Sequence, residues 1–485
     1  MMLTIEYVPS VLEALEVAFP TPPNRAKQQL DKYLVMLEKE MRLSLLNRSV
    51  FARRFGAYDI PLTKLINQSP TINNKRWRVH EWLGKHGHAL VENINKNANN
   101  ISKEIAILKP TANLIVNNDN LLKHLKSLSA NELDTYLNSL TQDWQLLIAD
   151  YQQHYKSLSA NERRIQYFTS PVDISALKRY MTEIVNGTST LKKSQQENSL
   201  LQAEYVLRLA QVNNGLLYQK IDKKAFGRTY YEGVNVLSVR KELRMAFLGK
   251  AWEYDCKSCS TAWKMSFANE WHSLKKRQTD VRHAFPAMTL YLEDKEVFFN
   301  YVIQYVFPQH TKQDYKPIIK EAMTALGFGA KLSIGKWRDY AGLENQSSLF
   351  AVFDEDVAVL KRFVSCDLVQ KFNKEQQTLS KFIVTKFSGD TTWQAEMATE
   401  QLRKKLSKSF SQAQKIVWLY QHAETIMMDI VRYEVKKSGN TVLANVHDAV
   451  VVRDQITANL LARIERKVQK RTGVAYFKLG ETSYL

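Results

Sequence analysis

The sequence predicts an α+β protein in which a mostly helical first part precedes a core of mixed helices and strands. Apolar residues recur at helical spacing over 25–45, after the turn sequence FPTPPN. From about residue 221 onwards, short strand-like runs alternate with helical patterns, and glycines separate them. A chain of 485 residues can form two or three domains. We expect a helical N-terminal domain over 1–120, a second helical region over 121–220 and the mixed core over 221–485.

Two similar sequences predict helix starts in the second helical region. HLKSLSANE at 124–132 is nearly repeated as HYKSLSANE at 154–162, and the asparagine-rich stretch 117–120 precedes them as a candidate linker. In each copy a serine precedes a glutamate by three residues, as Ser129 precedes Glu132. This spacing is typical of a capping box, in which each side chain bonds the other residue's free backbone amide. Two copies are too few for a repeat protein, so we interpret them as structural.

The composition excludes several classes of protein. No apolar run reaches the ~18 residues that span a bilayer, so we expect no membrane partner. The first residues, MMLTIEYVPSVLEALEVAF, include three glutamates and no lysine or arginine, unlike a signal or transit peptide. Three cysteines indicate a reducing compartment and no disulfide framework. We therefore expect a cytoplasmic protein, in a bacterium or in a phage-infected host cell.

The net charge indicates a polyanionic partner. The chain has 68 lysines and arginines against 49 aspartates and glutamates, which gives +19. A field of this sign attracts nucleic acid more often than anionic membrane. The excess is spread along the chain and includes basic runs at 274–282 and 403–408.

A strand pattern near the C-terminus, TVLANVHDAVVVRD at 441–454, is broken at its centre by His447 and Asp448. Both flanks are rich in β-branched residues and are about as long as short strands. The simple interpretation is a hairpin with a polar turn. The alternative is an acid held rigidly at a hairpin tip, where it can bind a metal ion.

Two further stretches supply partners for this acid. WEYDCKSCS places Asp255 at the end of a short aromatic strand. YKPIIKEAMTALGFG, at 315–329, predicts a helix with Pro317 in its first turn and glycines at its end. A stripe that suits a triphosphate and a base would run along one side of this helix, although an amphipathic helix with a basic exposed face is the structural alternative. The stripe consists of four residues at steps of four: Lys316, Lys320, Thr324 and Phe328.

Two other motifs fail as sites. Cys256 and Cys259 form a CxxC pair, but zinc needs two more ligands, and no second pair supplies them. GFGAKLSIGKW, at 327–337, is similar to a phosphate loop. A tryptophan follows its Gly-Lys where serine or threonine is required, and the leading glycine is one position too far away.

The remaining stretches together fit phosphoryl transfer. Two carboxylates from separate strands can hold two divalent ions about 3.5–4 Å apart. One ion activates an attacking hydroxyl, and the other neutralises the leaving pyrophosphate. Lysines on an opposing helix stabilise the charge on the transferring group. We therefore expect a site that joins nucleotides onto a strand that the positive charge of the chain holds.

Three stretches in this order resemble motifs A, B and C of the family A polymerase superfamily: the Asp255 strand, the Lys320 helix and the Asp448 turn. This superfamily contains family A DNA polymerases and the single-subunit RNA polymerases of bacteriophages and mitochondria. FGRTYYEG, at 226–233, is similar to the Gly-Arg segment that precedes motif A, which makes Arg228 a nucleotide-binding candidate. The resemblance covers the mixed core and implies a right-hand fold with palm and fingers, after a thumb-like second helical region.

The resemblance also implies a cofactor and its ligands. The cofactor is Mg²⁺, with two ions in the site, and Mn²⁺ is the alternative ion. Carried over residue by residue, Asp255 and Asp448 would be the metal-binding carboxylates, and the backbone carbonyl of Cys256 would be a further ligand. Lys320 would meet the triphosphate of the incoming nucleotide, with Lys316 in support.

Contacts to the base, the template and the sugar follow from the same resemblance. Phe328 would stack near the nascent base pair, and Gly329 would let the template strand pass close to the backbone. The helix over 415–432 would lie beneath the palm, with His422 and Glu424 as candidates for sugar or primer contacts.

The two branches of the superfamily differ at the sugar. DNA polymerases have a bulky glutamate five residues after the motif A aspartate, and here that position is Ser260, which leaves room for a ribose 2′-OH. Thr324 replaces the aromatic residue that the DNA branch has in motif B. HDAVVV is closer to the DNA branch, and Phe328 replaces a tyrosine whose hydroxyl is tied to ribose selection. The small side chain of Ser260 favours the RNA branch.

The sequence therefore favours a DNA-dependent RNA polymerase that acts in transcription through two metal ions. Its partners would be a DNA template, nascent RNA and nucleoside triphosphates, and no protein partner is indicated. The alternative is a family A-like DNA polymerase or a primase-polymerase of a phage or mobile element, which would extend a DNA primer. A basic nucleic-acid-binding protein without activity would instead keep Asp255 and Asp448 far apart, or bury one of them in a salt bridge.

Overall fold

The structure is a computed structural model. It describes the following residues: 3–46, 52, 56–73, 76–94, 105–118, 120–139, 144, 148, 153–222, 227–274, 280–308, 315–335, 337–338, 344–345, 347–403 and 410–484. Most of the two basic runs, namely 275–279 and 404–408, lies outside these ranges.

The chain divides into two compact units. Unit 1 comprises Met1–Asp222 and Tyr230–Lys250, and unit 2 comprises Lys223–Thr229 and Ala251–Tyr484. Unit 1 spans both predicted helical regions and takes in a piece of the predicted core. The three predicted domains therefore stay predictions.

Unit 1 combines helices with small antiparallel sheets. Its described helices are α1 (Pro9–Ala18), α2 (Arg25–Leu46), α4 (Leu62–Gln68), α5 (Val79–Lys85), α6 (Leu121–Lys126), α7 (Ala130–Asn138), α9 (Ala160–Gln166), α10 (Ile174–Asn186), α11 (Lys193–Val212) and α12 (Lys241–Leu248). Its described strands are β1 (Leu3–Tyr7), β2 (Tyr58–Pro61), β3 (Thr71–Ile72), β4 (Trp77–Arg78), β5 (Val91–Asn93), β6 (Ile105–Pro110), β7 (Leu114–Asn118), β8 (Tyr167–Pro171), β9 (Leu216–Asp222) and β10 (Tyr230–Tyr231). They form the sheets β1-β7, β2-β6-β5, β3-β4 and β10-β9-β8.

Strands β1 to β7 correct the expectation that residues 1–120 are helical. They are two to six residues long, and β1, LTIEY, is one that alternates buried and exposed residues. Asn117 and Asn118, within the candidate linker 117–120, end β7, which pairs with β1. In this part, cross-strand pairing decides the structure more than local pattern does.

Two predictions for the first part are confirmed. The helical spacing over 25–45 belongs to α2, which buries Leu30, Leu37 and Met41. Both predicted capping boxes are formed, by Ser129 at the start of α7 and by Ser159 at the start of α9.

Unit 2 contains a sheet and a larger set of helices. Its described strands are β11 (Trp252–Cys256), β12 (Trp337–Arg338), β13 (Glu344–Asn345), β14 (Val442–Val446), β15 (Ala449–Val452) and β16 (Leu479–Ser483). Its described helices are α13 (Cys259–Met265), α14 (Ala268–Leu274), α15 (Val281–Ala284), α16 (Pro286–Glu293), α17 (Lys295–Val306), α18 (Lys316–Gly327), α19 (Ser348–Val352), α20 (Val357–Ser365), α21 (Asp367–Phe387), α22 (Thr391–Arg403), α23 (Gln412–Lys437) and α24 (Ala458–Thr472).

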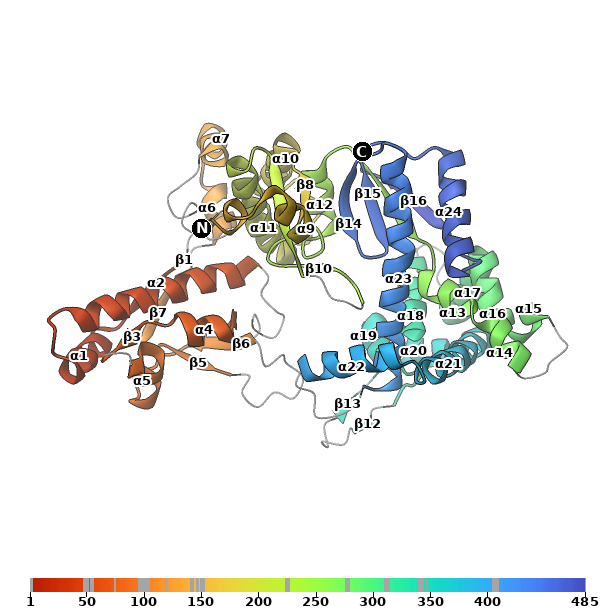
Figure 1. Ribbon diagram of the computed structural model, residues 1–485, viewed down its shortest axis with the longest axis horizontal. Helices are drawn as coiled ribbons and strands as arrows, with labels where there is room; N and C mark the ends of the chain where they lie inside the picture. The colour runs from red at the N-terminus through yellow and green to blue at the C-terminus, as the bar shows by residue number, and fades with distance from the viewer. Residues whose placement is uncertain are drawn as a thin grey trace. The chain divides into compact units, whose positions relative to one another are not determined.

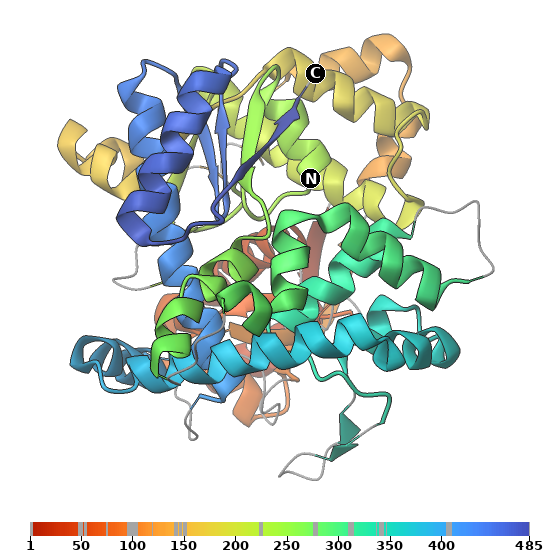
Figure 2. The same cartoon turned by 90° about the vertical axis from the view of Figure 1, so that its right-hand side faces the viewer.

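The main sheet of unit 2 has four strands in the order β14-β15-β11-β16, and every neighbouring pair is antiparallel. Helix α23 packs against β14 and β15, and α24 packs beside α23 (Figures 1 and 2). All four residues of β15 are buried, which explains the uninterrupted apolar sequence AVVV. The predicted hairpin over 441–454 and the predicted aromatic strand before Asp255 are thus confirmed.

Helices α13, α16, α17, α18 and α21 form a second layer of unit 2. Helix α13 packs against α16, α21 and α23, and α18 packs against α17, α19 and α21. Figure 2 shows α21 as the long pale-blue helix of this layer. The mixed sheet-and-helix composition of the core is as predicted, whereas its assignment to palm and fingers stays a prediction. No helix within the described ranges is long and apolar enough to cross a membrane.

Candidate active site

The two acids that the sequence singles out lie on adjacent strands of the main sheet. Asp255 of β11 pairs with Ala449 of β15, which directly follows Asp448. The backbone N–H of Cys256 donates a hydrogen bond of 2.8 Å to the carbonyl oxygen of Asp448. The structure therefore brings the backbones of both acids together, as neighbours across one strand pair.

Both acids are next to strained backbone. His447, the first residue of the two-residue turn between β14 and β15, has φ of 46°, and Ser258, just beyond β11, has φ of 50°. Left-handed backbone costs non-glycine residues of order 1–3 kcal/mol and is concentrated at functional sites. Left-handed backbone thus directly precedes Asp448 and follows β11.

Asp448 has an unusual electrostatic environment. The pKa of its carboxyl is raised to about 6, mainly by burial and also by Glu424 and Asp255, while Arg228 lowers it. Like charges that are forced together disfavour ionisation, and a bound cation would relieve both the repulsion and the cost of burial. The half-buried carboxyl of Asp448 is therefore suited to a positively charged ligand.

Arg228 forms an ion pair with Glu424 of α23. Its Nε and one terminal nitrogen each donate a hydrogen bond of 2.6 Å to the Glu424 carboxylate, which is fully buried. Glu424 is thus held beside Asp448 and has no exposed atom for sugar or primer. For Arg228, a nucleotide contact stays a prediction, and the contact that the structure gives it is structural.

In the part of the chain that the structure describes, neither Asp255 nor Asp448 takes part in an ion pair. The purely structural alternative requires the two acids to be far apart or one of them to be salt-bridged. Adjacent strands and unpaired carboxylates fit neither version of it.

Lys295 of α17 lies beside this acid pair and was not predicted. Its ammonium donates a hydrogen bond of 2.7 Å to the hydroxyl of Ser258 and lies 4.8 Å from the centre of the Tyr291 ring. Burial lowers the pKa of Lys295 to about 8.

Further charges act on the same ammonium. Lys320, Lys257 and Lys316 lower the pKa of Lys295, whereas Asp255 raises it. Lys316 and Lys320, the predicted motif B lysines, and Asp255, the predicted motif A acid, are therefore all within electrostatic range of the Lys295 ammonium. Lys316 is partly exposed and forms an ion pair with Glu296, at 2.5 Å.

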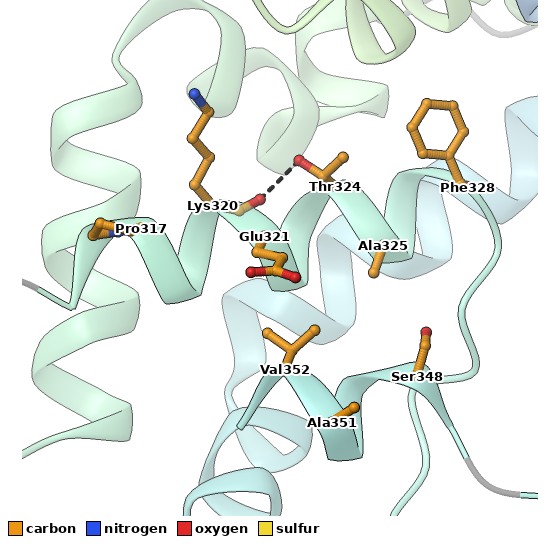
Figure 3. Close-up of a pocket in the computed structure, with 9 residues that line it drawn as sticks. All are labelled: Pro317, Lys320, Glu321, Thr324, Ala325, Phe328, Ser348, Ala351 and Val352. Carbon is orange, nitrogen blue, oxygen red and sulfur yellow. Dashed lines mark hydrogen bonds between the residues drawn. The ribbon is translucent and has the colours of Figure 1, made fainter. Parts of the chain in front are cut away.

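The predicted stripe lies on one side of α18, as Figure 3 shows for Lys320, Thr324 and Phe328. Lys320 and Thr324 are exposed, while their sequence neighbours Ile319 and Met323 are buried. The Thr324 hydroxyl donates a hydrogen bond of 2.8 Å to the carbonyl of Lys320. The helix prediction, including Pro317 in the first turn, is confirmed.

A cleft of about 730 Å³ lies between α18 and α19. Its lining is mostly apolar, and Lys320, Thr324 and Phe328 contribute to it from α18 while Ala351 and Val352 contribute from α19 (Figure 3). A volume of this size is in the range of ligand pockets.

The C-terminal end of α18 is docked on α13. The ammonium of Lys264 donates a hydrogen bond of 2.5 Å to the carbonyl of Gly327, and burial lowers the pKa of Lys264 to about 7. The hydroxyl of Ser260 lies 3.6 Å from the place that a Cβ on Gly327 would take. Ser260 is therefore next to the residue before Phe328, whose ring lies 5.6 Å from that of Tyr420.

Gly329 and His422 have other surroundings than those predicted. Gly329 has φ of 90°, and a Cβ on it would lie 3.0 Å from the Cβ of Ala413, so both backbone and packing require glycine there. The pKa of His422 is lowered by burial, and the charge that acts on it is Glu396 of α22. The template contact of Gly329 and the nucleotide contact of His422 stay predictions.

Sequence reasoning missed Lys257 and Lys295. Lys257 follows Asp255 by two residues, so strand periodicity could have placed both side chains on one face. Lys295 lies 40 positions beyond Asp255 in the sequence, and no local pattern connects them. Only the packing of α17 beside α18 brings its ammonium to the site.

The donor set at the acids suits Mg²⁺. In the described ranges, no three His, Cys, Asp or Glu side chains are grouped so that they could hold a metal ion. Mg²⁺ keeps several water ligands and is typically bound by one or two carboxylates together with substrate phosphates. Two carboxylates and the carbonyl of Cys256 therefore fit an ion that arrives with a nucleotide.

Comparisons with known proteins are sparse. No protein-family model matches the chain, and no curated protein matches it. Among solved structures it is similar to the "POL domain of Pol1 from M. smegmatis complex with DNA primer-template and dNTP". The two share 11% identity over 70% of this chain and 72% of that chain, with a TM-score of 0.38. So low a score carries no argument, and the function is inferred from the site itself.

Proposed function

We propose that this chain is a template-directed nucleotidyltransferase, and more specifically a DNA-dependent RNA polymerase. One arrangement carries the proposal. Asp255 lies on the strand next to the turn that holds Asp448, and the Lys295 ammonium is within electrostatic range of both Asp255 and the lysines of α18. Acids that hold divalent ions beside a group of lysines are what transfer of a nucleotidyl group requires.

The acids would bind the metal ions, and the lysines would bind the triphosphate. When bound, two Mg²⁺ ions would activate the attacking hydroxyl and neutralise the leaving pyrophosphate. Asp255, Asp448 and the carbonyl of Cys256 would hold them. Lys320 would bind the triphosphate, because its exposed ammonium lies on the stripe of α18. Lys295 would bind it too, because Ser258 and the ring of Tyr291 hold its ammonium in place.

Sugar recognition would take place at the end of α18. Ser260 lies beside Gly327, so a small hydroxyl side chain is found where the DNA branch has a bulky glutamate. Space at this position would admit a ribose 2′-OH. Phe328 and Thr324 line the neighbouring cleft, which offers an apolar surface to a base.

Extension of a labelled primer, together with synthesis without a primer, tests this function. Template, Mg²⁺ and either NTPs or dNTPs would be supplied, and kcat/KM would be measured for matched pairs. We expect ribonucleotides to be used and preferred. Exclusive use of dNTPs would establish the DNA polymerase alternative, which Phe328 favours because it lacks the tyrosine hydroxyl. Addition of neither kind of nucleotide would contradict the proposal as a whole.

A further inference from the structure

Strand β16 has a glycine directly opposite the predicted metal-binding acid. Gly480 pairs with Asp255 in the antiparallel register of β11 and β16. A Cβ on Gly480 would lie 2.7 Å from Oδ1 of Asp255 and 2.8 Å from Cε of Lys257. Such short separations do not occur between real atoms of this kind. The carboxylate of Asp255 and the stem of Lys257 therefore occupy the space that a side chain at 480 would need.

The strand cannot easily move away from these side chains. On one side of Gly480, the Leu479 N–H donates a hydrogen bond of 2.9 Å to Glu465 of α24. On the other side, Glu481 accepts a hydrogen bond of 2.7 Å from the hydroxyl of Tyr254. These bonds hold β16 in its register. A methyl group at 480 would therefore displace the carboxylate and the lysine stem before it displaced the strand.

Backbone conformation does not require glycine at 480, because its φ lies outside the left-handed region. Glycine in a strand interior is destabilising relative to alanine, so local propensity favours alanine here. Glycine inside a strand often marks a close approach by another group. At this position the approaching group is the Asp255 carboxylate.

We propose that Gly480 is a positioning residue of the active site: its missing side chain leaves the space in which the Asp255 carboxylate is held. The proposal rests on the function proposed above, since Asp255 matters there as a ligand of the metal ions. Lys257 shares this space, and its stem passes beside the same carboxylate.

Gly480→Ala tests the proposal through activity. Misplacing a reacting group by about 1 Å can lower a rate about 10²-fold, and we expect a loss of that order in kcat for nucleotide addition. The Mg²⁺ concentration for half-maximal activity should rise, and template binding should stay within about twofold, because many dispersed cations provide it. The matched control is Gly389→Ala, where the nearest atom to the added Cβ is 3.9 Å away, so activity should not change. Parent-like kcat and Mg²⁺ dependence in Gly480→Ala would overturn the proposal.

A double-mutant cycle tests the same contact without activity. Gly480→Ala should lower the Tm of the parent by roughly 3 °C. The same substitution in an Asp255→Ala background should lower Tm much less, because the obstructing carboxylate is gone. An equal fall in both backgrounds would contradict the proposed contact.

The outcomes separate this inference from the proposed function. Loss of activity in Asp255→Asn together with full activity in Gly480→Ala would reject the role of Gly480 and leave the polymerase function standing. Full activity in Asp255→Asn would reject the proposed function, while the Tm cycle would still decide whether Gly480 makes room for the carboxylate.

Discussion

Among the described residues, a buried glutamate pairs with an arginine in each unit, and the two pairs compared below have different surroundings. In unit 1, Arg208 and Glu204 of α11 are both completely buried, at 3.4 Å. In unit 2, Glu424 is equally buried, but 21% of the Arg228 side chain is exposed. Buried charge by itself therefore does not identify a functional site.

The pair in unit 1 is enclosed by structural partners. Arg208 donates hydrogen bonds to the backbone carbonyls of Tyr136 and Leu137, at 3.0 and 3.2 Å. Glu204 accepts a hydrogen bond of 3.0 Å from the indole of Trp144 and another from the Tyr136 hydroxyl. The pair ties the C-terminal end of α7 to α11. Among the described residues, Oε2 of Glu204 and Nε of Arg208 are buried without a hydrogen-bond partner.

The pair in unit 2 lies beside an acid that has no such partners. Glu424 contributes to the raised pKa of Asp448, and the ionised Asp448 carboxylate is left for a cation from outside. The difference teaches that an unpaired acid next to a buried pair, and not the pair itself, is the better candidate for a functional residue.

The largest effect should follow from breaking the pair in unit 1. Glu204→Gln leaves the buried guanidinium of Arg208 without its counter-charge, which typically costs about 3–5 kcal/mol. Chemical unfolding of unit 1, followed by circular dichroism, measures this loss. Asp31→Asn is the control, since the exposed pair of Asp31 with Lys27 should contribute less than about 1 kcal/mol. Equal changes for both variants would remove the distinction between buried and exposed pairs.

Removing a lysine near the unpaired acids should affect activity and not stability. Lys320→Ala should lower kcat/KM for nucleotide addition by about 10²–10³, because a charged contact to phosphate is lost. Lys316→Ala should cost less, because Lys316 is partly exposed and already paired with Glu296. Lys361→Ala, at an exposed position of α20, is the control. If Lys320→Ala behaves like this control, α18 is an ordinary amphipathic helix.

Asp448→Asn should stabilise the metal-free protein, in the opposite direction to Glu204→Gln. The pKa of Asp448 is raised from 3.8 to about 6, so the native state binds this proton more tightly than the unfolded state does. Stability is therefore lost as the pH rises from about 4 through 6, by about 1.4 kcal/mol for each pH unit in between. The uncharged asparagine avoids this loss. We expect a gain of about 2–3 kcal/mol at pH 7.5 that shrinks below pH 6 and is absent below about pH 4.

Thermal unfolding of both proteins in a metal chelator, at several pH values, checks this prediction. A loss of stability at pH 7.5, or a gain that does not depend on pH, would show that Asp448 is a structural acid like Glu204.

The smallest effect concerns the sugar. Phe328→Tyr adds a hydroxyl beside the proposed ribose site, and about one neutral hydrogen bond corresponds to a tenfold preference. The ratio of kcat/KM for NTP over dNTP should therefore rise by roughly ten. Ser260→Glu should reverse the preference by crowding the 2′ position. Unchanged ratios in both variants would place sugar selection elsewhere.

The sequence predicts the strands and the helix of the candidate site better than the contacts between distant segments. The β15 hairpin and the β11 strand were predictable, because their apolar runs are buried and the acids interrupt them at strand ends. The stripe of α18 was predictable because helical periodicity alone fixes it. These features depend on residues that are near one another in the chain.

Contacts between distant segments could not be predicted. The pairing of Arg228 with Glu424 joins residues 196 positions apart, and Lys295 meets Ser258 across 37 positions. Gly480 was missed for the same reason, because its closeness to the Asp255 carboxylate depends on the register of β16 against β11. Short strands in unit 1 were missed because their partners, and not their own sequences, stabilise them.

Nucleotide addition by Asp255→Asn and Asp448→Asn tests the central claim most directly. Extension of a labelled primer with Mg²⁺ would be measured for both variants, for the parent and for Asp429→Asn, a control that changes an exposed acid of α23. Loss of a metal ligand costs several kcal/mol, so both variants should lose at least about 10³ in rate while template binding stays nearly intact. The control should match the parent. Activity within about tenfold of the parent in either variant would contradict the assignment of these two acids as the metal-binding pair of a polymerase.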